Sequence, residues 1–324
     1  MIHTAAVEQN DNSQTRLSIN VPELNRMDGW LREAKIKDVV LVQDGDLLWE
    51  WYDKGADRVA PVFSCTKSIL SALIGIVTDD GHLSLEQTVS EFFDKVPEHK
   101  AGITIQHLLT MTSGMEWPDF DKPYFEMRKS GNWLDYILNQ PQSHKPGEIY
   151  AYNSGCSHLL SAILTKVTGQ SALTFAEGRL FGPIGMDGKT RWNHAAGISE
   201  GGAGMHMTAR DMARFGQLYL QEGSWEGQQL ISSDWVREST RIQHKGLLNY
   251  KPPIYGYYGW HWWCSPQDHN GKADCYFALG YGGQYLVVIP PCNLVAVIRK
   301  QVDGKNNAMR CKELLFEHIL KEKG

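Results

Sequence analysis

The chain has 324 residues, of which 42% are hydrophobic and 21% are charged, and these ordinary globular values exclude wholesale disorder and a fibrous repeat. The net charge of -5 argues against nucleic acid as the main partner, because no basic surplus exists to neutralise phosphates. The longest apolar stretch, residues 69–77, is too short to span a bilayer, so no membrane partner is expected.

Three features of the sequence bear on the cellular compartment and on metal binding: the N-terminus, the histidines and the cysteines. Residues 1–16 show no basic segment followed by an apolar one, which predicts a cytoplasmic protein without a secretory signal. The histidines contain no His-Glu-x-x-His, so neither a metal nor another cofactor is expected. The cysteines form no CxxC pair, and free thiols are expected rather than disulfides, at Cys65, Cys156, Cys264, Cys275, Cys292 and Cys311.

The N-terminal part predicts a helix and then a β-hairpin. Apolar residues over 22–35 have helical spacing. Two β-rich runs follow, residues 39–42 and 47–52, with the turn residues Asp44 and Gly45 between them. An Asp-Gly pair between two such runs is typical of a hairpin.

The C-terminal part repeats that pattern. Residues 285–289 and 294–298 predict a second hairpin around Pro290 and Pro291, and a helix is expected to follow through Ile319.

The stretch between the two hairpins has mostly helical periodicity, over residues 80–235. The order of elements predicts an α/β fold of the α+β type, in which both chain ends build one antiparallel sheet flanked by helices. We expect residues 1–79 and 236–324 to form a discontinuous sheet domain and residues 80–235 a helical domain. The active site is expected in the cleft between them.

A Ser-x-x-Lys tetrad, Ser64 to Lys67, precedes an apolar helical run. This context places Ser64 at a helix N-terminus, where the dipole and the free backbone N–H groups favour a developing anion. Ser64 and Lys67 are three residues apart on that helix and share a face, so the Lys67 amine can reach the Ser64 hydroxyl. The alternative is a capping serine beside a solvated lysine.

A serine hydroxyl needs an adjacent base to become a nucleophile. The Lys67 amine can act as this base once it is deprotonated. Alternatively, its positive charge can stabilise another base such as a phenolate. Tyr152 is a candidate for that second base, because it lies where the loop of residues 146–153 enters a helical run. Core packing is the alternative role of this tyrosine.

A third segment places Gly280, Tyr281 and Gly282 directly before a strand. Glycines beside a strand allow close approach of a ligand or another backbone, and they can present an N–H group to an oxyanion. A β-bulge or a hairpin entry is the alternative.

Together these segments resemble the penicillin-recognising, class C β-lactamase-like superfamily of serine hydrolases. That superfamily includes esterases, D-aminopeptidases, D,D-peptidases and 6-aminohexanoate-dimer hydrolases. The resemblance covers about residues 35–320 and includes further stretches in the family's order, at residues 81–89, 103–115, 181–186 and 202–212.

The resemblance implies a role for each motif residue. Ser64 corresponds to the acylated nucleophile, Lys67 to its partner and Tyr152 to the proton shuttle. The backbone N–H groups of Ser64 and Tyr281 would form the oxyanion hole. Family position also makes Trp117 and Tyr124 walls of the cleft, and Ser154, Gly280 and Gly282 substrate contacts.

Departures from the family pattern indicate the substrate. Where β-lactamases carry a cation and a hydroxyl before the glycine of the third motif, this chain has Ala278 and Leu279 before Gly280. Losing a charged hydrogen bond costs about 1.5–3 kcal/mol. Ser154 stands where the lactamases have an amide. Both changes favour the esterase and 6-aminohexanoate-dimer hydrolase branch over the enzymes that act on β-lactams or peptidoglycan.

The sequence therefore predicts a serine hydrolase that cleaves a small ester or a linear amide through a Ser64 acyl-enzyme. The alternatives are a β-lactamase or D,D-peptidase, and a non-catalytic relative that senses a ligand. A small molecule is the expected partner, and the sequence leaves the oligomeric state open.

Overall fold

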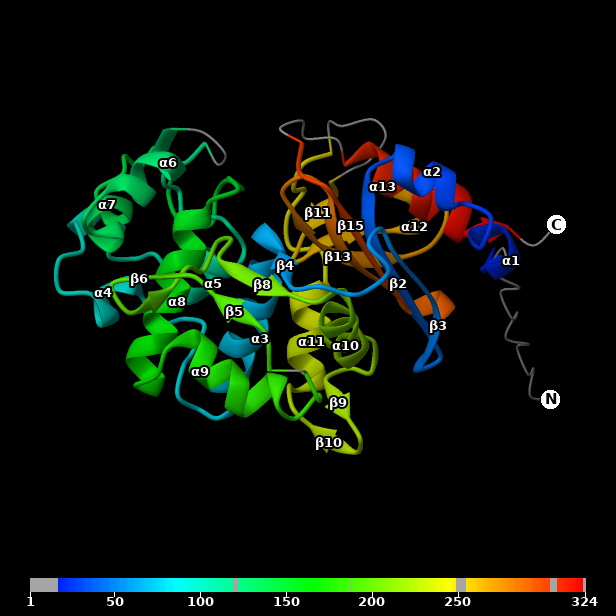
Figure 1. Ribbon diagram of the computed structural model, residues 1–324. Helices are drawn as coiled ribbons and strands as arrows, with labels where there is room; N and C mark the ends of the chain where they lie inside the picture. The colour runs from blue at the N-terminus through cyan, green and yellow to red at the C-terminus, as the bar shows by residue number, and fades with distance from the viewer. Residues whose placement is uncertain (1–16, 119–121, 187, 249–254, 304–307, 323–324) are drawn as a thin grey trace, which may run out of the picture.

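The computed structural model describes residues 17–118, 122–186, 188–248, 255–303 and 308–322, and a seven-stranded antiparallel sheet lies at its centre (Figure 1). The strands come from both chain ends, which confirms the predicted fold class. Their spatial order is β11 (Tyr257–Tyr258), β12 (Trp263–Ser265), β13 (Cys275–Gly280), β14 (Gln284–Ile289), β15 (Leu294–Lys300), β2 (Ile36–Gln43) and β3 (Asp46–Tyr52).

Both predicted hairpins are present, and β15 pairs with β2 to join them. The first turn works because Asp44 and Gly45 both adopt positive φ, at 53° and 89°, which suits the tight turn between twisted strands. All six residues of β14 are buried, as expected for a strand covered on both faces.

Helices cover the two faces of the sheet (Figure 1). α2 (Asp28–Glu33) and α13 (Met309–Glu313) lie on one face, and α10 (Ala209–Leu220) lies on the other. α10 falls within the 80–235 stretch that the sequence assigns to the helical domain, yet it packs on the sheet. Its approach is close, because a Cβ at Gly216 would lie 2.6 Å from Val295 Cγ1.

The predicted helix over 22–35 is two short helices instead. α1 (Val21–Leu24) ends at Leu24 with Asn25 as its C-cap, and α2 begins at Asp28. The break is fixed by tertiary contacts, since the Trp49 indole donates to the Asn25 side chain at 2.9 Å and Met27 is buried. The predicted C-terminal helix is confirmed, and it continues beyond α13 as a π-helical segment, Leu314–Ile319.

The remaining helices lie mostly to one side of the sheet (Figure 1). They are α4 (Val89–Phe92), α5 (Ile105–Leu109), α6 (Lys122–Lys129), α7 (Trp133–Leu138), α8 (Ser154–Thr168) and α9 (Ala172–Ala176). Between them and the sheet runs α3 (Thr66–Asp79), which also contacts α11 (Ser233–Thr240). α3 is buried all round from Thr66 to Val77, so its position is fixed from every side.

Short strands complete the described structure. A three-stranded sheet in the order β4 (Ala60–Pro61), β8 (Met205–Met207) and β5 (Arg191–Trp192) adjoins the start of α3. Other short elements include β1 (Leu17–Ser18) with β16 (Lys321–Glu322), β6 (His194–Ala195) with β7 (Ile198–Ser199), β9 (Ser224–Trp225) with β10 (Gln228–Gln229), and α12 (Gln267–Asn270). None of the helices in the described ranges combines the length and hydrophobicity needed to cross a bilayer.

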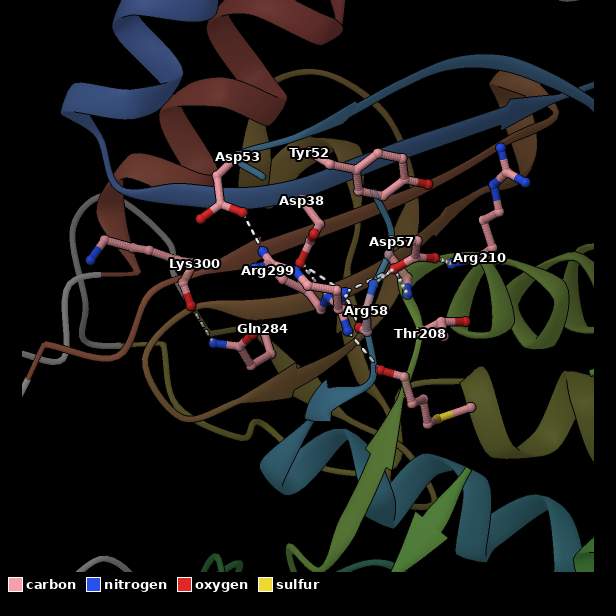
Figure 2. A network of polar contacts seen from close by, with 12 residues as sticks. Asp38, Tyr52, Asp53, Asp57, Arg58, Thr208, Arg210, Gln284, Arg299 and Lys300 are labelled. Atoms are coloured by element: carbon pink, nitrogen blue, oxygen red, sulfur yellow. Dashed lines mark hydrogen bonds and ion pairs between the residues drawn. The ribbon is translucent and has the colours of Figure 1, made fainter. Parts of the chain in front are cut away.

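A buried arginine ties the small sheet to the large one (Figure 2). The Arg299 guanidinium, 0% exposed, pairs with Asp38 at 2.7 Å and with Asp57 at 3.1 Å. It also donates to the backbone carbonyls of Met207 at 2.7 Å and Arg58 at 2.9 Å. The cation thus links β15, β2, β8 and the loop that leads to β4 and Ser64.

Replacing Arg299 by Met should destabilise the fold by about 3–5 kcal/mol, because it leaves the buried Asp38 carboxylate without its counter-ion. Urea unfolding measures the change. Arg237→Met is the matched control, since Arg237 and its partner Asp234 are exposed, and it should cost less than about 0.5 kcal/mol. Equal losses from the two variants would contradict this role of Arg299.

Lys312 on α13 is a second buried cation. Its Nζ lies 4.2 Å from the centre of the Phe277 ring, 5.0 Å from that of Phe316 and 5.4 Å from that of Tyr285. Among the described residues this amine has no hydrogen-bond partner. Burial lowers the pKa of Lys312 to about 8.

Between pH 8 and the ordinary lysine pKa of 10.5, the unfolded chain holds a proton at Lys312 that the folded chain has lost. Stability should therefore rise with pH across this window, with the cost of burial fully present below it. Lys312→Met should stabilise the protein at pH 7 by roughly 3 kcal/mol, since one pKa unit corresponds to about 1.4 kcal/mol. Urea unfolding of both proteins at several pH values checks this, and a variant advantage that stays constant up to pH 10 would contradict it.

Candidate active site

Ser64 lies in a strained turn between β4 and α3. The turn is a 3₁₀ segment, Phe63–Cys65, and Phe63 has a φ of 49°, a conformation that bulky residues rarely adopt. Hydrogen bonds hold the turn on both sides of Ser64. The Val62 N–H donates to the Met205 carbonyl at 3.0 Å, and the Thr66 hydroxyl donates to the Phe63 carbonyl at 2.6 Å. The strain and its supports fix the position of Ser64 at the start of α3.

The Lys67 amine joins three separate segments at one point. Its Nζ donates to Ser64 Oγ at 3.1 Å, to Ser154 Oγ at 3.0 Å and to the Gly202 carbonyl at 2.8 Å. The Lys67 side chain is buried. The sequence prediction that Lys67 can reach Ser64 is thus met by the geometry, and the distance suits proton transfer between the two.

Ser154 is placed by the start of α8. Asn153 caps this helix, and its side-chain oxygen accepts from the N–H groups of Gly155 at 2.7 Å and Cys156 at 3.2 Å. Ser154 is therefore the first residue of α8. A Cβ at Gly202 would lie 2.8 Å from Ser154 Cβ, so this glycine allows the loop before β8 to press against Ser154.

The Tyr152 ring lies beside the lysine, with Lys67 Nζ 4.7 Å from the ring centre. Two residues of the aromatic run at 255–263 hold the ring. Trp263 stacks on it at 5.7 Å between ring centres, and Tyr258 meets it edge-on at 6.1 Å. An aromatic face at this range stabilises a cation, and the packing fixes the phenol close to the Ser64–Lys67 pair.

The end of β13 comes very close to the Ser64 turn. A Cβ at Gly280 would lie 2.1 Å from the Val62 carbonyl oxygen, so a side chain there would push the two segments apart. Tyr281 follows directly, and its ring meets that of Phe63 edge-on at 5.8 Å. The backbones at Ser64 and Tyr281, which the family resemblance assigns to an oxyanion hole, thus belong to segments in direct contact.

A cavity of about 470 Å³ opens at Ser64, between the sheet and the helical part. Residues from both parts line it: Pro61, Phe63, Ser64, Tyr124, Phe125, Arg128, Ser154, Asn193, Glu200, Ala203, His206 and Tyr281.

Several predicted contacts are not at this cavity. Trp117 lies in the core, 3% exposed, where its ring packs edge-on against Tyr136 at 6.1 Å. Gly282 has a φ of 76° and faces the Val302 side chain, and Gly280 packs on the Val62 carbonyl. The structure therefore gives Trp117, Gly280 and Gly282 packing roles, whereas Tyr124 and Ser154 do line the cavity.

The cavity wall contains a charged group that was not predicted from the sequence. Glu200 is buried, and its carboxylate accepts a hydrogen bond from the Tyr124 hydroxyl at 3.0 Å and lies 3.8 Å from Arg128. Burial and this carboxylate raise the pKa of Tyr124 well above its usual value. The available signal was an acid directly before Gly201 and Gly202, but its partners lie more than seventy residues away and could not be read from the sequence.

The site is that of a serine hydrolase, and comparisons with known proteins give its family. The family model described as Beta-lactamase matches residues 37–313, so this chain belongs to the β-lactamase family. The chain is 23% identical over 330 residues to the 6-aminohexanoate-dimer hydrolase of Paenarthrobacter ureafaciens, covering 92% of this chain and 82% of that protein.

Two solved structures share the fold. A Bacillus anthracis protein provisionally named 6-aminohexanoate-dimer hydrolase superposes with a TM-score of 0.75 at 23% identity, covering 90% of this chain and 80% of its own. A D-stereospecific amidohydrolase from a Streptomyces species superposes with a TM-score of 0.68 at 15% identity, covering 92% and 98%.

Gly280→Ala should slow the reaction of Ser64 with a fluorophosphonate probe by about a hundredfold or more. The added Cβ must move β13 away from Val62, and the backbone N–H at residue 281 moves with it. Gly29→Ala is the control, because no atom lies within 4 Å of a Cβ at Gly29. Labelling rates are measured together with melting temperatures. Labelling of a folded Gly280→Ala variant at the wild-type rate would contradict the assigned contact.

Proposed function

We propose that this protein hydrolyses a small ester or a linear amide through an acyl-enzyme on Ser64. The observation that carries the proposal is the buried contact of 3.1 Å between Lys67 Nζ and Ser64 Oγ, at the floor of a cavity large enough for a small acyl group. A serine hydroxyl becomes nucleophilic when a general base lies within hydrogen-bond distance of its oxygen and can take up its proton.

In the proposed mechanism, Lys67 and Tyr152 act as one acid–base pair. Ser64 Oγ attacks the carbonyl carbon as its proton passes to the pair, and the carbonyl oxygen takes up negative charge. The backbone N–H groups of Ser64 and Tyr281 stabilise that charge. The pair then protonates the leaving alcohol or amine as its bond to the acyl carbon breaks. In the second half of the reaction, a water molecule gives a proton to the pair and attacks the acyl carbon. The bond to Ser64 Oγ then breaks, the pair returns the proton to Ser64, and the carboxylic acid is released.

The third motif and the names of the relatives support the proposed substrate class. Ala278, Leu279 and Gly280 offer neither a cation nor a hydroxyl to meet the carboxylate of a β-lactam. The names of the relatives, a 6-aminohexanoate-dimer hydrolase and a D-stereospecific amidohydrolase, support a linear amide as one substrate. We therefore place esters and linear amides ahead of β-lactams.

Ser64→Ala should lower the initial rate of p-nitrophenyl butyrate hydrolysis by about a thousandfold or more, because the variant has no nucleophile. Lys67→Met should show a loss of similar size. Ser71→Ala is the matched control, since Ser71 is a buried serine on the same helix, and it should keep the wild-type rate. An unchanged rate in Ser64→Ala would overturn the proposal. A stable penicillin adduct on Ser64 without ester turnover would favour a D,D-peptidase instead.

A further inference from the structure

A second cavity, of about 440 Å³, adjoins the one at Ser64 and shares Pro61 and Phe63 with it. It has a basic lining, with four cations and one acid, in a chain whose net charge is -5. The residues that line it are Lys37, Asp53, Lys54, Arg58, Pro61, Phe63, Gln284, Lys300, Gln301 and Val302.

Lys37, which lines this cavity, lies at an irregularity of the large sheet. Asp38 pairs with Arg299 and Ile36 with Lys300, so Lys37 is an extra residue in β2 without a partner position on β15. A bulge of this kind redirects a side chain and interrupts the alternation of faces. Ile36 and Asp38 are buried on either side, whereas Lys37 lines the cavity.

The cations of this cavity exceed the acids that could neutralise them. Arg58 pairs with Asp53, as Figure 2 shows, and Lys300 lies 3.5 Å from Asp303. Within the described part of the chain, Lys37 and Lys54 have no ion-pair partner.

Burial lowers the pKa of Lys37, and the guanidinium groups of Arg299 and Arg58 lower it further, whereas the carboxylates of Asp38 and Asp53 raise it. A bound anion would relieve the repulsion and would gain charge-assisted hydrogen bonds from several amines.

The two cavities meet at the residue that precedes the nucleophile. Phe63 lines both of them, and Ser64 opens only into the first. A substrate that occupies both cavities would place its carbonyl carbon at Ser64 and pass Phe63, which lines both of them. Such a substrate would place its reacting bond and its charged end in separate compartments.

We propose that the basic cavity binds a negatively charged end of the substrate, a carboxylate or a phosphate, held by Lys37, Lys54 and Arg58. This inference rests on the proposed hydrolase function and narrows its substrates to anionic esters or amides. The charged end lies on the acyl or on the leaving-group side of the reacting bond, and the two sides can be tested separately.

The test compares three esters: neutral p-nitrophenyl butyrate, p-nitrophenyl hydrogen glutarate with its charge on the acyl side, and 4-butyryloxy-3-nitrobenzoate with its charge on the leaving group. The quantity measured is the ratio of kcat/KM for each anionic ester to that for the neutral one. The double variant Lys37→Met/Lys54→Met should lower this ratio about tenfold or more for one anionic ester. Lys95→Met, at an exposed lysine that lines neither cavity, should leave both rates and their ratio unchanged.

Binding of glutarate and of inorganic phosphate, followed by calorimetry, gives a second readout that needs no turnover. Wild type should bind at least one of these anions, and the double variant should lose that binding; the anion bound more tightly identifies the group. If all esters are hydrolysed through Ser64 but the ratios do not change in the double variant, the anion site is wrong and the hydrolase function stands. If no ester is hydrolysed, the hydrolase function fails, and the absence of anion binding to wild type would overturn the site as well.

Discussion

The buried amine of Lys67 is the constraint on which the arrangement of this protein depends. A buried amine is costly unless polar partners surround it, so the three oxygen atoms around Lys67 Nζ must be in place together. Each has its own support in the fold. The turn at Phe63 fixes Ser64, the Asn153 cap fixes Ser154, and close packing against Ser154 fixes the Gly202 carbonyl. The resulting geometry brings residues from α3, α8 and the loop before β8 to one atom.

The large sheet places this cluster next to Tyr281, whose backbone N–H is expected to stabilise the oxyanion. Gly280 lets β13 touch the Ser64 turn, and Arg299 ties the loop at Asp57, which precedes that turn, to Asp38 of β2. Both contacts require components from opposite ends of the chain. Neither end of the chain alone supplies both sides of these contacts. The two cavities that meet at Phe63 are a consequence of the same geometry.

Local chemistry made part of this structure predictable. The Asp44-Gly45 turn and the spacing of Ser64 and Lys67 depend on neighbouring residues, so the hairpin and the contact between the two side chains could be inferred from the sequence. Trp117 could not be placed, because a residue in a loop takes its position from distant packing. The Glu200–Arg128 pair and the β-bulge at Lys37 also arise only in three dimensions. The break between α1 and α2 depends on Trp49, twenty-four residues away from Asn25.

In the proposed mechanism, Ser64 carries the acyl group during turnover. The most direct test is to mix the protein with p-nitrophenyl butyrate, quench with acid within milliseconds, and locate any adduct by mass spectrometry of the digested chain. We expect a butyryl group on the peptide that contains Ser64, and we expect this adduct to decay as p-nitrophenol continues to be released. Continued turnover with no adduct on that peptide, or an adduct on another residue, would contradict it.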